Sequence, residues 1–480
     1  MSSRHKTQIR HERADCPPCT AAPLWVIPRR PQVQDLMGNV AGDGGTRQPR
    51  PRSIWLLLIL GALAAVAAEA QNPPPTDTPA ETTALTRAWA FVEKGTLSAS
   101  ARYRFEVFDR DEPAFPDTAE ASTFRLAVGY ETPPVLGISG FAEYEGVFAL
   151  GSASYNVPGV PEQTKPGYPS ILDPEGHELN QAWLRWRHKG TNLHASLTVG
   201  RQEFMLNDGR FVSLAPWRQN HQTFDAVRAD LGLPHGFSLT YLFADRARRV
   251  VGEDAADGTP PMDSHWFDAH WRLKNRVDVG VYGVMLDYES PPQYGLSTKT
   301  FGVRCTGPWR IDANWDIHYV TEFAQQQDFG QNPDRINANY WLGELGVVYR
   351  GHRLNGGIAW LGGRSATDKL STPLAHPFNG WTELFASNPS SGTSHGLQAT
   401  YVSATGTAWS KAPLIYSATF YDYRSVSDHR HYGNEVDLGL VWKVKPVYER
   451  WEIGCRCACY WADTLFCDAL RASVYTAVSF

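Results

Sequence analysis

The sequence has very few long apolar runs, and this excludes a bundle of transmembrane helices. Only one such run occurs in 480 residues, at positions 54–66, although 42% of the residues are hydrophobic. A helical membrane protein needs several apolar runs of about 20 residues each. Instead, aromatic residues make up 12% of the chain and glycine occurs 41 times. That composition favours a β-barrel with a wet interior and aromatic girdles.

Positive charge is also scarce, and no credible constellation of catalytic residues is present. The formal net charge is −5, and residues 1–70 hold nine basic but only five acidic residues, so the rest of the chain is more acidic still. A generally basic nucleic-acid-binding protein is therefore excluded. The sequence shows no credible constellation of catalytic residues and no phosphate-binding loop after a predicted strand. We therefore expect neither an enzyme nor a bound cofactor.

The single apolar run reads as part of a secretory signal peptide at 47–70. Three arginines precede the run, and Ala68-Glu69-Ala70 follows it as a cleavage site. A signal anchor is the alternative, but the run is short for a membrane span. Residues 1–46 show no periodic pattern and are predicted to be a non-native or disordered extension, which also contains a C-x-x-C motif ahead of the signal peptide.

Beyond a predicted linker or short periplasmic helix at 71–95, apolar and polar residues alternate along most of the chain. In the first segment, apolar residues from Leu97 to Val107 alternate with Arg102, Arg104 and Glu106. Period-two alternation places the two sets on opposite faces of a sheet. Such segments predict about 18 strands, an even number, as in single-chain outer-membrane barrels. They lie at 97–107, 122–131, 136–146, 179–188, 193–202, 222–231, 236–245, 264–273, 276–288, 298–307, 311–325, 339–350, 353–362, 395–403, 413–424, 433–443, 449–460 and 471–480.

The connections between these segments alternate between long and short. Long ones such as 146–178 and 363–394 alternate with short ones such as 188–192 and 274–275. Outer-membrane barrels have this parity, with short periplasmic turns and long extracellular loops, whereas a soluble sandwich has no reason to keep it. The chain also ends on Phe480 after an alternating strand. We therefore predict an all-β, transmembrane antiparallel barrel over 96–480, in the outer membrane of a Gram-negative bacterium.

Arginine is frequent on the strand faces predicted to point inward. Its guanidinium offers a rigid fork of donors that matches a carboxylate, and a ring of such groups in a pore selects anions. An alternative is that these arginines pair with inward acidic residues such as Glu106, Asp225 and Glu344, and only balance charge inside the barrel. The candidate substrate-binding residues on the inward faces are Arg102, Arg104, Arg125, Arg185, Arg187, Arg201, Arg228, Arg304 and Arg456.

Three cysteines, Cys455, Cys457 and Cys459, occupy alternate positions of one predicted strand, with Cys467 beyond it. Alternate strand residues lie about 6.6 Å apart and project in parallel, so their sulfur atoms do not converge on a metal ion. We interpret them as small apolar residues that face lipid, and we predict no metal site.

Two long motifs resemble the alginate export porin family. They are GRQEFMLNDGRF at 200–211 and WRQNHQTFDAVR at 217–228. Shorter segments with the same likeness are YEGV at 144–147, ELNQAWL at 178–184 and TPLAHPFNGW at 372–381. The resemblance covers about residues 96–480.

The resemblance implies an 18-stranded outer-membrane barrel with an arginine-lined, electropositive constriction that passes a polyuronate. It implies that Arg201 and Arg228, at the ends of the long motifs, belong to the lumen. Arg210 and Arg218 fall in the loop between the motifs, where they line the outer mouth or anchor a loop folded into the pore. The segment 372–381 is open to the same two interpretations.

The function expected first is passage of an anionic, alginate-like polysaccharide. Two alternatives remain open: a porin that takes up small anionic or aromatic solutes, and a structural or adhesive barrel whose lumen is sealed. The expected partners are the anionic permeant, outer-membrane lipid and the barrel assembly machinery, with periplasmic export proteins added if the chain exports polysaccharide. Nucleic acid is not an expected partner.

Overall fold

The computed structural model describes residues 91–480 except 274–275, 376–378, 386–392, 409–412 and 445–449. The predicted extension, the signal peptide and most of the predicted linker at 71–95 lie outside the described residues. From residue 94 onward the chain forms one compact unit that is almost entirely β-sheet. None of the helices in the described ranges has the length and apolar character that crossing a membrane requires.

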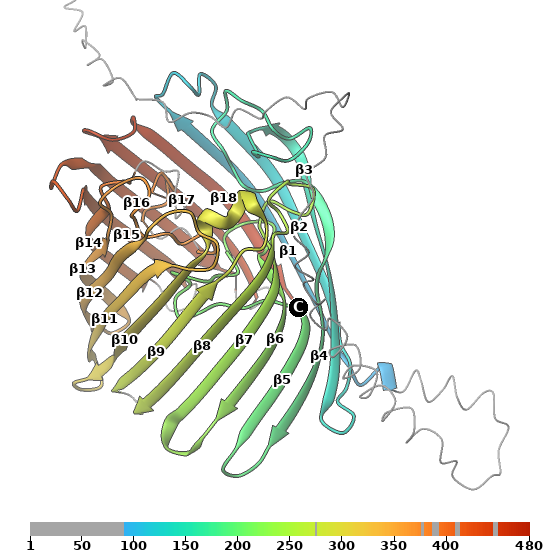
Figure 1. Ribbon diagram of the computed structural model, residues 1–480. Coiled ribbons are helices and arrows are strands. Elements are labelled where there is room, and N and C mark those ends of the chain that lie inside the picture. The colour runs from blue at the N-terminus through green and yellow to red at the C-terminus, as the bar shows by residue number, and fades with distance from the viewer. Residues whose placement is uncertain (1–90, 274–275, 376–378, 386–392, 409–412, 445–449) are drawn as a thin grey trace, which may run out of the picture. The chain divides into compact units, whose positions relative to one another are not determined.

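Eighteen antiparallel strands form one sheet, and the predicted fold class is confirmed (Figure 1). The strands are β1 (Thr96–Arg110), β2 (Ala119–Glu131), β3 (Ile138–Ser154), β4 (Gly176–Lys189), β5 (His194–Gln202), β6 (Thr223–Gly232), β7 (Phe237–Arg248), β8 (Pro261–Leu273), β9 (Val277–Leu286), β10 (Thr298–Arg310), β11 (Trp315–Asp328), β12 (Asn337–Tyr349), β13 (His352–Leu361), β14 (Leu397–Ala408), β15 (Leu414–Arg424), β16 (His431–Lys443), β17 (Trp451–Ala462) and β18 (Ala469–Ser479). Two short 3₁₀ helices, η1 (Pro234–Gly236) and η2 (Pro291–Leu296), lie in connections.

The sheet closes on itself because its first strand pairs with its last. β1 pairs with β2 on one side and with β18 on the other, in a register that runs from Ser100↔Ser479 to Arg110↔Ala469. Closure leaves no unpaired strand edge, which is the condition for a sheet to cross a lipid bilayer. The N-terminal end of β1 and the C-terminal end of β18 lie at the end of the barrel that carries the short turns.

Long and short connections alternate from β3 to β15, as the sequence predicts, whereas the last three connections, 425–430, 444–450 and 463–468, are of similar length. The longest are 155–175, 203–222 and 362–396, and all lie at the end opposite the chain-terminal ends of β1 and β18. β3 continues to Ser154, beyond the predicted 146, and pairs there with the start of β2 through a bulge. Strands can extend beyond the apolar band, where the lipid no longer requires an apolar outer face.

The two faces of the sheet differ as the alternation predicts. Apolar side chains cover the outside, where Leu438 and Val474 are 51% and 53% exposed. Inward positions carry charge, and Arg104 and Glu106 on β1 are 0% and 1% exposed. Cys455 and Cys457 line an outward apolar groove with Phe105, Val107, Leu438 and Leu440, in agreement with a lipid-facing position. Cys467 differs, because it is a buried residue of the β17–β18 loop.

The interior is not uniformly wet, which differs from the sequence-based expectation. Part of it is filled by an apolar core between the walls and inserted loops. Phe204 and Phe211 of the β5–β6 loop contact Trp266 and Tyr282 of the wall at ring-centroid distances of 5.6 and 5.7 Å. Phe385 of the β13–β14 loop contacts Tyr423 at 4.4 Å. Some inward wall positions are therefore aromatic rather than polar, because they pack against apolar side chains of the inserted loops.

Candidate functional site

Three of the outer loops fold into the barrel and contact one another. In the β5–β6 loop (203–222), Val212 pairs with Leu374 of the β13–β14 loop (362–396) in an isolated parallel bridge. The backbone N–H of Ser213 donates to the Leu374 carbonyl over 2.9 Å. The backbone N–H of Gln219 donates to Oδ1 of Asp173, in the β3–β4 loop (155–175), over 2.7 Å. The three loops therefore form one assembly across the interior.

A buried ion network holds this assembly against the closing seam of the barrel. Its members alternate in charge, and each side chain is at most 15% exposed. Arg218 pairs with Glu383, which also pairs with Arg471 of β18 over 2.9 Å. Arg471 donates to Glu106 of β1 over 2.7 Å. The full network is Arg104, Glu106, Asp173, Arg218, Glu383 and Arg471.

The charges of this network are mutually stabilised, as the loop residues show. Burial opposes ionisation of Glu383, but the Arg218 and Arg471 guanidinium groups outweigh burial and lower its pKa below the usual 4.5. Burial likewise disfavours the charge of Arg218, but Glu383 and Asp173 outweigh it and raise the pKa of that guanidinium. Removing one member would leave its partners charged in a poorly solvated site, which is costly.

Other strand residues form hydrogen bonds with the β5–β6 and β13–β14 loops. Arg102 of β1 donates to the Pro216 carbonyl over 2.9 Å and to Gln219 Oε1 over 2.8 Å. On β16, Glu435 accepts the backbone N–H of Thr382 over 2.8 Å, and Asp437 accepts that of Trp381 over 3.2 Å. In the β5–β6 loop, Glu203 bonds the His221 ring over 2.7 Å. Burial raises the pKa of Glu203, but the bond to His221 outweighs it and the net pKa is lowered.

Most of the predicted lumen arginines form ion pairs with carboxylates. Arg125 donates to Glu145 over 2.6 Å, and Arg201 to Asp225 over 2.9 Å. Such pairing cancels much of the charge that a permeant would meet. The remaining pairs are Arg187–Glu131 at 3.4 Å, Arg228–Asp230 at 2.8 Å, and Arg304 with both Asp208 at 3.0 Å and Glu322.

Arg185 and Arg456 are different, because each stacks on tryptophan and makes no ion pair with any described residue. The Arg456 Cζ atom lies 3.7 Å from the Trp217 ring centroid and 4.8 Å from that of Trp381. The Arg185 Cζ atom lies 3.8 Å from the Trp183 ring centroid, and its Nε donates to Thr198 over 2.9 Å. Stacking occupies the guanidinium face and leaves in-plane N–H donors for a carboxylate.

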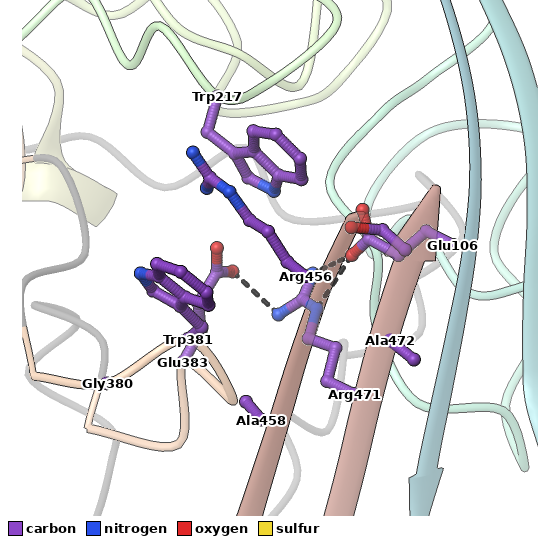
Figure 2. Close-up of a pocket in the computed structure, with 10 residues that line it drawn as sticks. Glu106, Trp217, Gly380, Trp381, Glu383, Arg456, Ala458, Arg471 and Ala472 are labelled. Carbon is purple, nitrogen blue, oxygen red and sulfur yellow. Dashed lines mark hydrogen bonds and ion pairs between the residues drawn. The ribbon is translucent and has the colours of Figure 1, made fainter. Parts of the chain in front are cut away.

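Figure 2 shows Arg456 beside Trp217 and Trp381, next to the ion pairs of Arg471. Trp217 comes from the β5–β6 loop, Trp381 from the β13–β14 loop and Arg456 from the wall strand β17. These side chains line a small cavity of about 30 Å³, which Glu383 and Arg471 also line. Residues of two loops thus place two indole rings beside the guanidinium of Arg456, a wall residue near the middle of the barrel.

The predicted site residues consequently fall into three groups. Arg102, Arg104, Arg210 and Arg218 anchor loops, and Arg210 donates to Asn379 over 3.4 Å. This geometry favours the anchoring interpretation of Arg210 and Arg218. The second group is paired on the wall: Arg125, Arg187, Arg201, Arg228 and Arg304. Arg185 and Arg456 form the third.

Sequence reasoning missed several residues that build the site. Arg471 could have been found, because it lies on the strand face opposite Val474 and therefore points inward. Asp173 and Glu383 lie in loops without periodicity, so no sequence pattern marks them, whereas Trp217 and Trp381 belong to the motifs at 217–228 and 372–381 and could have been found there. Their positions follow only from how the loops pack.

Closure of the sheet, an apolar outer face and a charged interior with inserted loops define a transmembrane β-barrel channel of the Gram-negative outer membrane. Within this class, residues 162–359 match the family model described as alginate export, which confirms the resemblance seen in the motifs at 178–184, 200–211 and 217–228.

Solved structures of outer-membrane barrels share the fold. OccAB3 of Acinetobacter baumannii is 11% identical with a TM-score of 0.62, and the match covers 81% of this chain and all of that one. OccK9 (OpdG) of Pseudomonas aeruginosa is 15% identical with a TM-score of 0.61, covering 81% and 99%. P. aeruginosa OpdK, solved with vanillate, is 14% identical with a TM-score of 0.58, covering 81% and 99%. A search of curated proteins found no match.

Proposed function

We propose that this barrel passes an anionic, alginate-like polysaccharide, whose carboxylates contact Arg456 and Arg185 in turn. The observation that carries the proposal is that these two arginines stack on tryptophan and have no carboxylate partner among the described residues. The family match to alginate export over residues 162–359 supports a uronate as the permeant.

The chemistry of the two positions suits a chain of carboxylated sugar rings. A guanidinium fork replaces part of the hydration of a carboxylate, and the neighbouring indole ring offers an apolar face to a sugar. Arg456 lies at mid-barrel, whereas Arg185 lies near the short-turn end of β4. Transport requires several weak sites rather than one tight site, because a permeant must also leave.

Recording from planar bilayers tests this function. We expect the reversal potential in a KCl gradient to show selectivity for anions, and oligouronates to block the current. Neutral oligosaccharides of equal length serve as the control and should block far less. Cation selectivity without block by oligouronates would contradict the proposal.

Passage of small anionic or aromatic solutes is the second candidate. The inserted loops, fixed by the buried ion network, narrow the interior and favour it. In the same recordings, permeation of succinate or an aromatic carboxylate without block by oligouronates would favour this candidate. A complete absence of conductance would instead favour the structural barrel.

A further inference from the structure

A row of polar and cationic side chains lies on the outer wall of the barrel, above its aromatic girdle. Strand register defines the girdle: Val303 of β10, Phe323 of β11, Trp341 of β12 and Trp360 of β13 are consecutive partners. The rings of Phe323 and Trp341 lie 4.3 Å apart. Aromatic girdles mark the boundary between hydrocarbon and headgroups.

Four residues closer to the extracellular end, the same register brings together Lys299 of β10, Gln327 of β11 and Asn337 of β12. Lys299 points outward, because its neighbours Thr298 and Thr300 are buried inside. Four strand residues span about 13 Å, so this row lies at headgroup depth rather than in the hydrocarbon. These three residues lie at the ends of β10, β11 and β12 that adjoin the outer connections 287–297 and 329–336.

Two further cations complete the surface. Arg335 precedes β12, and Arg364 follows β13 and donates to the Asn337 carbonyl over 3.0 Å. With Lys299 and Gln327 they line a cavity of about 350 Å³. A second cavity, of about 320 Å³, shares Arg364 with the first and is also lined by Trp360.

The acidic residues of this surface are already engaged. Asp368 pairs with Arg364 over 2.7 Å and accepts the Asn337 N–H over 2.8 Å. Asp328 accepts the Ile336 N–H over 3.0 Å. By contrast, neither Lys299 nor Arg335 has an ion-pair partner among the residues that the structure describes. An unpaired cation beside a membrane attracts anionic headgroups.

We propose that Lys299, Arg335 and Arg364 bind a phosphate group of the phosphorylated glycolipid in the outer leaflet. The acyl chains would then lie along the apolar wall below, over Phe301 and Val303, which are 46% and 43% exposed. The phosphate would lie in the 350 Å³ cavity, where guanidinium and ammonium donors converge. This site is on the outside of the barrel and is independent of the permeant.

Binding of lipid A to the purified barrel in detergent tests the site. The probes are lipid A with two phosphates, the same lipid after dephosphorylation, and inorganic phosphate, with affinity measured by native mass spectrometry. We expect K299Q/R335Q to bind the bisphosphorylated lipid about tenfold more weakly than the wild type. Neither residue has an ion pair with a described residue to lose, so the barrel should still fold.

The matched control is R310Q/R350Q, which removes two exposed cations from the opposite, short-turn end of β10 and β12. This control should bind lipid A as the wild type does. Equal binding by K299Q/R335Q, or equal binding of the dephosphorylated lipid, would overturn the proposal. So would displacement of the lipid by an equimolar amount of inorganic phosphate, because the site would then be a simple anion site.

Discussion

Arg304 and Arg456 both point from the wall into the barrel, but only Arg304 meets a carboxylate. Arg304 lies 3.0 Å from Asp208 and also pairs with Glu322, whereas Arg456 stacks on Trp217 at 3.7 Å. Its neighbours, not its residue type, therefore decide whether an arginine fixes the structure or remains available to a permeant. Arg456 is the residue that best tests this distinction.

We predict that Arg456→Lys and Arg456→Gln separate charge from shape. Lysine keeps the positive charge but loses the planar fork and its stacking on tryptophan. R456K should therefore retain anion selectivity while block by oligouronates weakens about tenfold, a loss of roughly 1.4 kcal/mol. R456Q should lose both properties. The measurement is single-channel recording, and unchanged block in both variants would show that Arg456 does not contact the permeant.

At the scale of elements, the inserted loops behave as parts of the wall. The β13–β14 loop is held by Arg471 of β18, by Glu435 and Asp437 of β16, and by Arg218 of the β5–β6 loop. Buried ion pairs of this kind add little net stability but make removal of one partner expensive. Glu383 touches both another loop, through Arg218, and the barrel seam, through Arg471.

We predict that acid loosens this loop. The pKa of Glu383 is lowered from 4.5, so its charge stabilises the docked loop fully above about pH 4.5. That contribution is lost as the pH falls through the lower pKa of the folded state. Single-channel recordings should therefore show larger and noisier currents as the pH is reduced below about 4.5.

Glu383→Gln should reproduce the acid effect at pH 7, because it leaves Arg218 and Arg471 buried without that carboxylate. The expected cost to loop docking is about 3–5 kcal/mol. Glu253→Gln is the control, since Glu253 pairs with Arg248 at 3.4 Å on an exposed loop. Quiet, unchanged currents in E383Q would mean that the network does not hold the loop.

At the scale of the whole molecule, the barrel depends on an outer face that lipid can cover. Leu438 lies near the middle of β16 and is 51% exposed on that face, while its neighbour Asp437 points inward and is 1% exposed. Leu438 therefore faces the hydrocarbon, and the adjacent Asp437 faces the barrel interior. A one-residue shift in register would exchange them.

We predict that Leu438→Arg lowers the free energy of unfolding in bilayers by about 2–4 kcal/mol, because a charge then faces the hydrocarbon. Leu438→Ala, the control, should cost much less. Equilibrium unfolding in lipid vesicles measures both. Equal stability of L438R and L438A would mean that this wall does not face lipid.

The strands could be predicted from the sequence because consecutive strand residues alternate between facing lipid and facing the barrel interior. Arg102, Arg104 and Glu106 are correctly assigned to the inward face of β1 for that reason. The loops could not be predicted in this way. Glu383 and Asp173 meet Arg218 although they are distant in sequence, and no periodic pattern connects them.

The sequence by itself determined the barrel: its strand number, the alternation of long and short connections along most of the chain, and the face on which most strand charges lie. Alternation carries this information because lipid penalises every misplaced polar group. Only the tertiary structure decided which arginines are paired, since an ion pair depends on the distance between side chains from separate elements. It placed Arg456 between Trp217 and Trp381, residues of two loops that meet only after the barrel has closed.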